Sequence, residues 1–203
     1  MTTLYFVRHG QTIWNQAHRM QGFKNSPLTS IGLAQADQLG QYLATDSTIT
    51  RLLVSPSPRA QQTAAHLNAS LHKPILTVPE FQELNMGSWE GQTHTWIAQH
   101  MPLEWHRFWD DPEHYQGLNG GETFTALAQR AVRGFNRLQQ RYPEQTQVIV
   151  AHRVTLRVLL AQLLQRPINA IPDPQPTSLT KLTLINGHYA VDFLNRTNVH
   201  VLA

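Results

Sequence analysis

The segment LYFVRHGQTIWN, residues 4–15, changes abruptly from apolar to charged. Its first four residues are typical of a short strand that is buried on both faces of a parallel sheet. Arg8 and His9 follow at once, although neither side chain suits an apolar core. Gly10 then allows the backbone to turn sharply or to come close to a ligand. The segment therefore predicts a parallel strand whose carboxyl end presents a cation and a titratable base to a bound molecule.

Strands and helices alternate along the rest of the chain. Further strands are expected in RLLVSPS (51–57), PILTV (74–78) and QVIVA (147–151), and helices in 27–44, 58–71, 120–142 and 154–165. Thr29 is expected to cap the first helix and Pro58 to begin the second. A hairpin that turns at Asn186-Gly187 is expected last. This order predicts an α/β fold, a three-layer sandwich with a mostly parallel central sheet and helices on both faces.

The composition is that of a globular protein. Of the 203 residues, 41% are hydrophobic and 14% charged, which suits one packed domain over residues 1–203. No apolar run reaches membrane-spanning length, and no basic leader precedes an apolar run at the amino terminus. The sequence contains no cysteine, which excludes disulfides, thiolate metal sites and a cysteine nucleophile. We therefore expect a cytoplasmic protein with no membrane partner.

The positive charge is spread along the chain. The formal net charge is +3, and the arginines form no basic stripe of the kind that nucleic acids require. We expect no nucleic-acid partner, and instead a small anionic molecule that gathers a few arginines into one pocket. A homodimer is left open.

The segment at about 92–120 is expected to be a lid-like insertion made of helical pieces over the site. It is rich in aromatic residues and contains His94, His100, His106 and His114. Their spacings of six and eight do not place them on one helix face, as shared metal ligands would require. We therefore predict no metal site here.

Charged residues follow three of the predicted strands. Arg8 and His9 follow the first, Arg59 the second, and His152 and Arg153 the strand QVIVA. If these strands are neighbours, their carboxyl ends bring the side chains to one edge of the sheet. Arginine matches phosphate oxygens with its planar fork, and histidine titrates near neutrality. The residue types alone thus predict a phosphate pocket.

Six segments, in order, resemble the motifs of the histidine phosphatase superfamily, also called the phosphoglycerate mutase-like family. They are RHGQTIWN (8–15), GFKNSPLTSIGLAQA (22–36), SPSPRAQQTA (55–64), ELNMGSWEG (83–91), GGET (120–123) and VIVAHRVTLR (148–157). The resemblance implies phosphoryl transfer through a phosphohistidine, with no metal and no cofactor. It implies that His9 is the nucleophile and Glu83 the proton donor. Arg8, Arg59 and His152 complete the implied catalytic set and bind phosphate, together with Asn15 and Gln21.

Two assignments carry alternatives. Glu80 and Glu90 compete with Glu83, and only the family spacing selects Glu83. Arg153 stands where most relatives carry glycine after the second histidine. It either points away into solvent or projects over the pocket as an extra anion ligand. We expect the first, because crowding a pocket is costly.

The function expected from this resemblance is hydrolysis of small phosphomonoesters, with a small phosphorylated metabolite as the substrate. One alternative is a phosphoglycerate mutase, which needs cations for the substrate carboxylate. Between Gly91 and Gly120 the chain has only Arg107 as a full cation, which favours hydrolysis. The other alternative is a non-catalytic binder of phosphorylated ligands.

Overall fold

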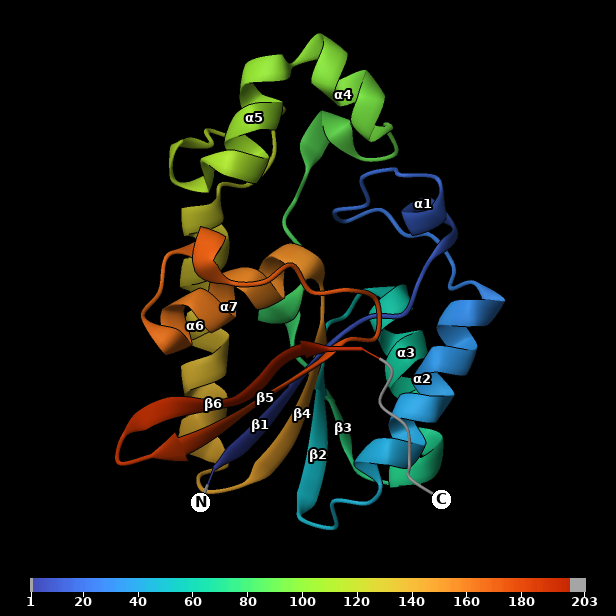
Figure 1. The fold of residues 1–203 in the computed structure, drawn as a ribbon, viewed down its shortest axis with the longest axis vertical. Coiled ribbons are helices and arrows are strands. Elements are labelled where there is room, and N and C mark those ends of the chain that lie inside the picture. The colour runs from blue at the N-terminus through green and yellow to red at the C-terminus, as the bar shows by residue number, and fades with distance from the viewer. Residues whose placement is uncertain (1, 198–203) are drawn as a thin grey trace.

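The computed structural model describes residues 2–197 and has one mixed sheet at its centre (Figure 1). The strand order is β3-β2-β4-β1-β5-β6. The first four of these strands run parallel, β5 is antiparallel to β1, and β6 is antiparallel to β5. The strands are β1 (Thr3–Arg8), β2 (Ile49–Val54), β3 (Ile75–Thr77), β4 (Thr146–Ala151), β5 (Leu179–Ile185) and β6 (His188–Arg196). The prediction of a mostly parallel sheet is confirmed.

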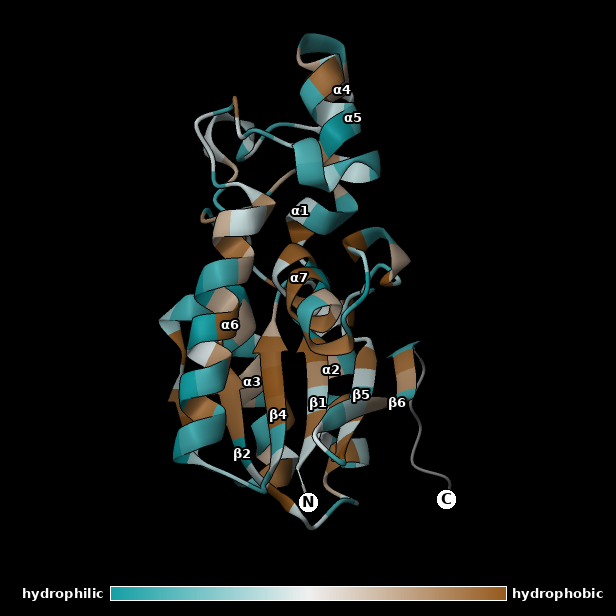
Figure 2. Cartoon of the chain, turned by 90° about the vertical axis from the view of Figure 1, so that its left-hand side faces the viewer, coloured by the Kyte–Doolittle hydropathy of each residue, from teal (hydrophilic) through white to brown (hydrophobic). Residues whose placement is uncertain are grey.

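Helices cover both faces of the sheet, which confirms the three layers. Tyr5 and Val7 of β1 pack in a core with helices α2 (Ser30–Leu43) and α3 (Pro58–Leu71). Leu4 and Phe6 point to the opposite face, because successive strand side chains alternate. There they pack in a core with α6 (Phe124–Arg141) and α7 (Arg153–Leu164). Burial on both faces explains why LYFV is apolar throughout, and the inner strands form the hydrophobic centre of Figure 2.

The predicted local signals lie where expected. Thr29 accepts a hydrogen bond from the backbone N–H of Gly32 and caps α2, and Pro58 occupies the first turn of α3. The hairpin of β5 and β6 turns at Asn186 and Gly187, whose φ angles are 50° and 82°. Two positive φ angles are what this turn type requires.

Short helices lie beyond the carboxyl ends of the parallel strands (Figure 1). They are α1 (Ile13–Gln16), α4 (His94–His100), α5 (Pro102–Asp110) and the 3-10 turn η3 (Pro112–His114). Three more 3-10 turns are η1 (Pro79–Phe81), η2 (Gly87–Trp89) and η4 (Ile168–Ala170). A third core, which includes Trp89, Ile97 and Phe108, joins α4 and α5 to the rest of the fold. Within residues 2–197, no helix is both long and apolar enough to cross a membrane.

Gly10 permits another group to come close to the backbone, and in the structure that group is the start of helix α2 rather than a ligand. A Cβ atom on Gly10 would lie 2.8 Å from the carbonyl oxygen of Gly32, and one on Gly32 would lie 2.3 Å from the carbonyl oxygen of Gln11. The start of α2 therefore packs directly on the backbone that follows His9. This contact fixes the loop that presents the histidine.

Replacing Gly32 with alanine is expected to destabilise the fold by about 1–3 kcal/mol, the usual cost of overpacking. The backbone of Gln11 would have to move, because no flexible side chain can yield there. Urea unfolding measures the effect. Gln38→Ala, on the exposed face of the same helix, serves as the control and should stay within about 0.5 kcal/mol of the parent. A Gly32→Ala variant as stable as this control would contradict the predicted close packing.

Candidate active site

A cavity of about 320 Å³ lies at the carboxyl end of the parallel strands. Its wall includes Arg8 and His9 from the end of β1, Arg59 from the first turn of α3, and Arg153 from the start of α7. Strand β4 lies between β2 and β1, so the three strand ends that carry these residues are neighbours. Arg8, His9, Arg59 and Arg153 therefore meet at one edge of the sheet, as the sequence predicts, whereas His152 is not among the residues of the cavity wall.

His9 presents an unprotonated nitrogen in this cavity. It is 3% exposed, and its Nδ1 lies 2.8 Å from the carbonyl oxygen of Gly10. A carbonyl can only accept, so we assign the ring proton to Nδ1 and the lone pair to Nε2. Arg59 Nε donates to that Nε2 at 3.3 Å. Burial, then the charges of Arg59 and Arg8, hold the pKa of His9 well below its ordinary value.

The two arginines beside His9 are buried cations. Arg59 is 1% exposed and donates to the carbonyl oxygens of Gly22 and Lys24. Arg8 donates from Nη1 to the carbonyl oxygen of Pro174 at 2.7 Å. Burial lowers the pKa of each to about 10. Neither arginine pairs with a carboxylate of residues 2–197, and an unpaired buried cation is costly, so the cavity favours an anion.

His152 lies next to His9, with ring centroids 5.2 Å apart. It is fully buried, and its Nε2 lies 2.7 Å from the hydroxyl oxygen of Ser55. Burial, then the charge of Arg59, holds its pKa well below the ordinary value. Among residues 2–197, its Nδ1 is one of a few buried polar atoms without a hydrogen-bond partner. The two imidazoles therefore share one site.

Glu83 lies against the amino terminus of α7. Its carboxylate accepts hydrogen bonds from the backbone N–H groups of Val154 and Thr155, from the Thr155 hydroxyl and from its own neighbour Leu84. These donors and the helix dipole stabilise the carboxylate. Glu83 is 4% exposed and lines the cavity.

The two competing glutamates lie outside the cavity wall. Glu80 pairs with Arg137 on the surface of α6. The carboxylate of Glu90 accepts from the backbone N–H groups of Phe23, Lys24 and Met86. Its contacts fix a loop, so the geometry favours Glu83 as the carboxyl group of the site.

Asn15 and Gln21 both line the cavity. Asn15 Oδ1 accepts from the backbone and hydroxyl of Thr12 and so caps α1. Gln21 Nε2 donates to the Thr12 hydroxyl, while its Oε1 is buried without a partner in the described part of the chain. Thr12 thus holds both amides at the edge of the site.

The expectation that Arg153 points into solvent is wrong. Its side chain is 28% exposed and lines the cavity, where Nε and Nη2 donate to the two carboxylate oxygens of Asp173. Its guanidinium carbon lies 4.2 Å from the ring centroid of Trp109. The ion pair with Asp173 and the contact with the Trp109 ring hold the Arg153 side chain in the cavity. It occupies space that would be empty if this residue were glycine.

Several further residues in the wall received no site role from the sequence. They include Trp14, His18, His94, Trp109 and Asp173. His94 packs against Trp105 and Trp109, and burial, then the charge of Arg153, lowers its pKa to about 4. Asp173 lies in the proline-rich loop before β5, where no periodic pattern marks it.

Across residues 2–197, no three histidine, aspartate or glutamate side chains are grouped as metal ligands would be.

Comparison with known proteins agrees with this geometry. The family model of the histidine phosphatase superfamily (branch 1) matches residues 4–197. The chain belongs to this superfamily.

Its relatives include both phosphatases and mutases by name. The chain is 33% identical over 191 residues to the "Uncharacterized phosphatase PhoE" of Bacillus subtilis, covering 94% of this chain and 90% of the relative. It is 33% identical over 172 residues to the "Probable phosphoglycerate mutase GpmB" of Yersinia pestis, covering 84% and 78%. The solved structure of Bacillus stearothermophilus YhfR matches with a TM-score of 0.90 and 33% identity, over 98% of both chains.

Proposed function

We propose that the protein is a phosphatase that hydrolyses small phosphomonoesters through a phosphohistidine on His9, with Glu83 as the proton donor. The observation that carries this proposal is the contact that sets the tautomer of His9. The contact from Nδ1 to the Gly10 carbonyl leaves the Nε2 lone pair beside Arg59, in a cavity that favours an anion. A nucleophile and its electrostatic support are thus assembled before substrate binds.

In the first step, His9 Nε2 attacks the phosphorus atom and the bond to the leaving oxygen breaks. Arg8 and Arg59 neutralise the phosphoryl oxygens, and the hydrogen bond from Arg59 Nε to His9 must transfer to the phosphate. The low pKa of His9 keeps Nε2 unprotonated near neutral pH. His152 supplies a further hydrogen-bonding nitrogen beside the transferred group.

Glu83 handles the proton in both steps. A bound phosphate dianion opposes the nearby carboxylate by like-charge repulsion, so substrate binding favours the protonated form. The acid then gives its proton to the leaving oxygen. The resulting carboxylate takes a proton from the water that attacks the phosphohistidine, and His9 and inorganic phosphate are released. The two steps together return His9 and Glu83 to their starting states.

A phosphoglycerate mutase is the second candidate, because a relative of equal identity carries that name. In that reaction the phosphohistidine would pass its group to a second hydroxyl of a bound phosphoglycerate. Isomerisation of 3-phosphoglycerate that depends on a bisphosphate primer would support it. Tight phosphate binding without turnover would instead support a non-catalytic binder.

Trapping the intermediate tests the proposal. The protein is mixed with a phosphomonoester labelled in its phosphoryl group and quenched in alkali, in which phosphohistidine is stable. We expect the label on the peptide that contains His9, and release of inorganic phosphate in the unquenched sample. Turnover with label on another residue, or with no labelled protein at any time, would contradict the mechanism.

A further inference from the structure

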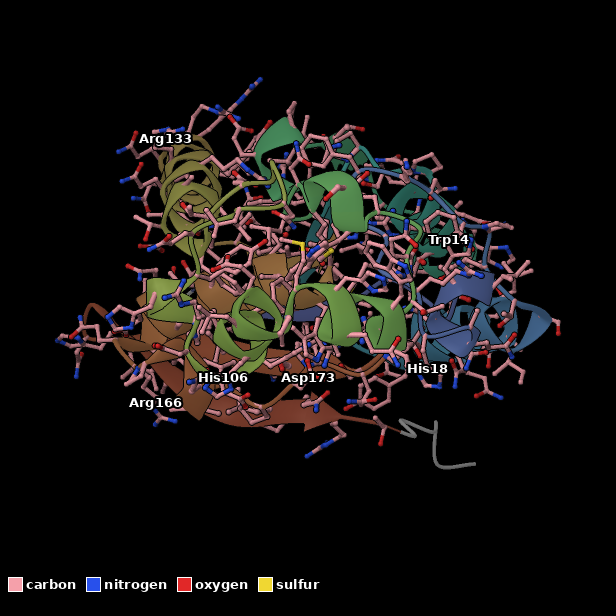
Figure 3. The ribbon with its side chains drawn as sticks, turned by 90° about the horizontal axis from the view of Figure 1, so that it is seen from above. Trp14, His18, His106, Arg133, Arg166 and Asp173 are labelled. Carbon is pink, nitrogen blue, oxygen red and sulfur yellow. The ribbon has the colours of Figure 1, made fainter. Side chains whose placement is uncertain are left out.

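Asp173 places a negative charge in the wall of a cavity suited to anions. It lines the cavity together with Arg8 and Arg153, and its two carboxylate oxygens accept from Arg153 in the paired geometry that a free carboxylate would adopt. Arg157, one helical turn after Arg153, also interacts electrostatically with Asp173. In projection from above, Asp173 appears between His106 and His18 (Figure 3). The position that a substrate carboxylate would take on Arg153 is thus already filled.

The pair of Arg153 and Asp173 is held on several sides. The backbone carbonyl of Asp173 accepts from Asn195 Nδ2 at 2.7 Å, and the next carbonyl along, that of Pro174, accepts from Arg8. Trp109 covers the guanidinium of Arg153. These contacts fix the backbone at Asp173 to the ends of β1 and β6, and they hold the guanidinium with which its carboxylate pairs.

Asp173 lowers the positive charge of the cavity wall by one unit. The lining residues include four arginines, Arg8, Arg19, Arg59 and Arg153, and two carboxyl groups, those of Glu83 and Asp173. Asp173 neutralises one of these cations, Arg153, with which it pairs. Without Asp173 the net charge of the wall would be one unit more positive, and Arg153 would be free to pair with a further negative group. The aspartate therefore removes the cation that a second anionic group would need.

We propose that Asp173 is a specificity-determining residue that excludes esters with a second negative charge, so that the substrates are phosphomonoesters with uncharged leaving groups. The proposal rests on the phosphatase activity proposed above. The leaving group then lies beside Arg153 and against the aromatic wall of Trp14, Phe108 and Trp109. Such a wall favours an apolar or hydroxylated group over a carboxylate.

A pair of substrates with the same three-carbon skeleton tests this. Glycerol 3-phosphate has a neutral hydroxymethyl group where 3-phosphoglycerate has a carboxylate. We expect kcat/KM to favour glycerol 3-phosphate by about tenfold or more, and Asp173→Asn to reduce that preference by about tenfold, the size expected for one charge a few ångströms away in partly screened surroundings. The measurement is the ratio of the two kcat/KM values for each variant.

Two further variants separate charge from structure. Arg153→Gln combined with Asp173→Asn restores the net charge of the parent, so the ratio should return toward that of the parent. Asp192→Asn makes the same substitution at an exposed aspartate that bonds Thr183 in the hairpin, and should leave the ratio unchanged.

The outcomes are distinct. A parent enzyme that prefers 3-phosphoglycerate, or a ratio that Asp173→Asn leaves unchanged, overturns the role of Asp173 while the phosphatase proposal stands. Equal changes in the single and double variants mean that lost packing, and not charge, alters recognition, which also overturns it. No phosphate release from either ester or from p-nitrophenyl phosphate overturns the phosphatase proposal and this inference with it.

Discussion

Replacing His9 with alanine is expected to lower kcat on any phosphomonoester by a factor on the order of 10⁴ to 10⁶, the range seen when a nucleophile is removed. His152 is not expected to take its place, because its side chain is fully buried and is not among the residues that line the cavity. The phosphorylated intermediate should disappear together with turnover. Steady-state rates and alkaline trapping of the label measure the two effects.

The His9→Ala protein should still bind inorganic phosphate. Arg8 and Arg59 keep their contacts to the carbonyl oxygens of Pro174, Gly22 and Lys24, so the cations remain in place. Calorimetric titration with phosphate checks this and shows that the site is intact. His188→Ala, at an exposed histidine of the hairpin, is the control and should keep the parent rate. Residual activity within tenfold of the parent would show that His9 is not the nucleophile.

The sheet could be predicted because its signals are local. Four residues of continuous apolar character identify a strand buried on both faces, and Asn186-Gly187 identifies the hairpin turn, without knowledge of distant contacts. The meeting of Arg8, Arg59 and His152 then follows from topology alone, because parallel strands bring their carboxyl ends to one edge. The strands and the turn are thus predicted from short segments alone, and the position of the site follows from the order of the strands.

The side-chain partners could not be predicted in the same way. The sequence places Arg153 in solvent because it shows the cost of crowding the pocket but not the partners that offset this cost. Trp109 and Asp173 lie 44 and 20 positions away in loops and short helices that no periodicity places. Whether Arg153 gains an ion pair and a ring contact depends on where the segments that carry Trp109 and Asp173 lie in the fold. The same reason applies to Gly10, which the sequence places next to a turn or a ligand and which lies against the backbone of Gly32.

Replacing Arg59 with glutamine is expected to lower kcat/KM by about 10²–10³, the usual loss on removal of one preorganised charge donor. A second effect is a change in pH dependence. Attack requires neutral His9, so kcat/KM falls when the pH drops through the pKa of that imidazole. Burial is the first cause of the low pKa of His9, and the charge of Arg59 is the second. Without that charge the pKa rises, and the acid limb of the profile moves to higher pH.

Arg59→Lys separates the two effects. Lysine keeps the charge but loses the planar fork that donates to His9 and to the carbonyl oxygens of Gly22 and Lys24. Its rate should fall, while its acid limb should stay near that of the parent. The substrate's own ionisation is the same for all three enzymes, so differences between their profiles of kcat/KM against pH report on the protein. If the glutamine and lysine variants share one acid limb, the charge of Arg59 does not set the protonation of His9, and burial together with the charge of Arg8 must keep that nitrogen free.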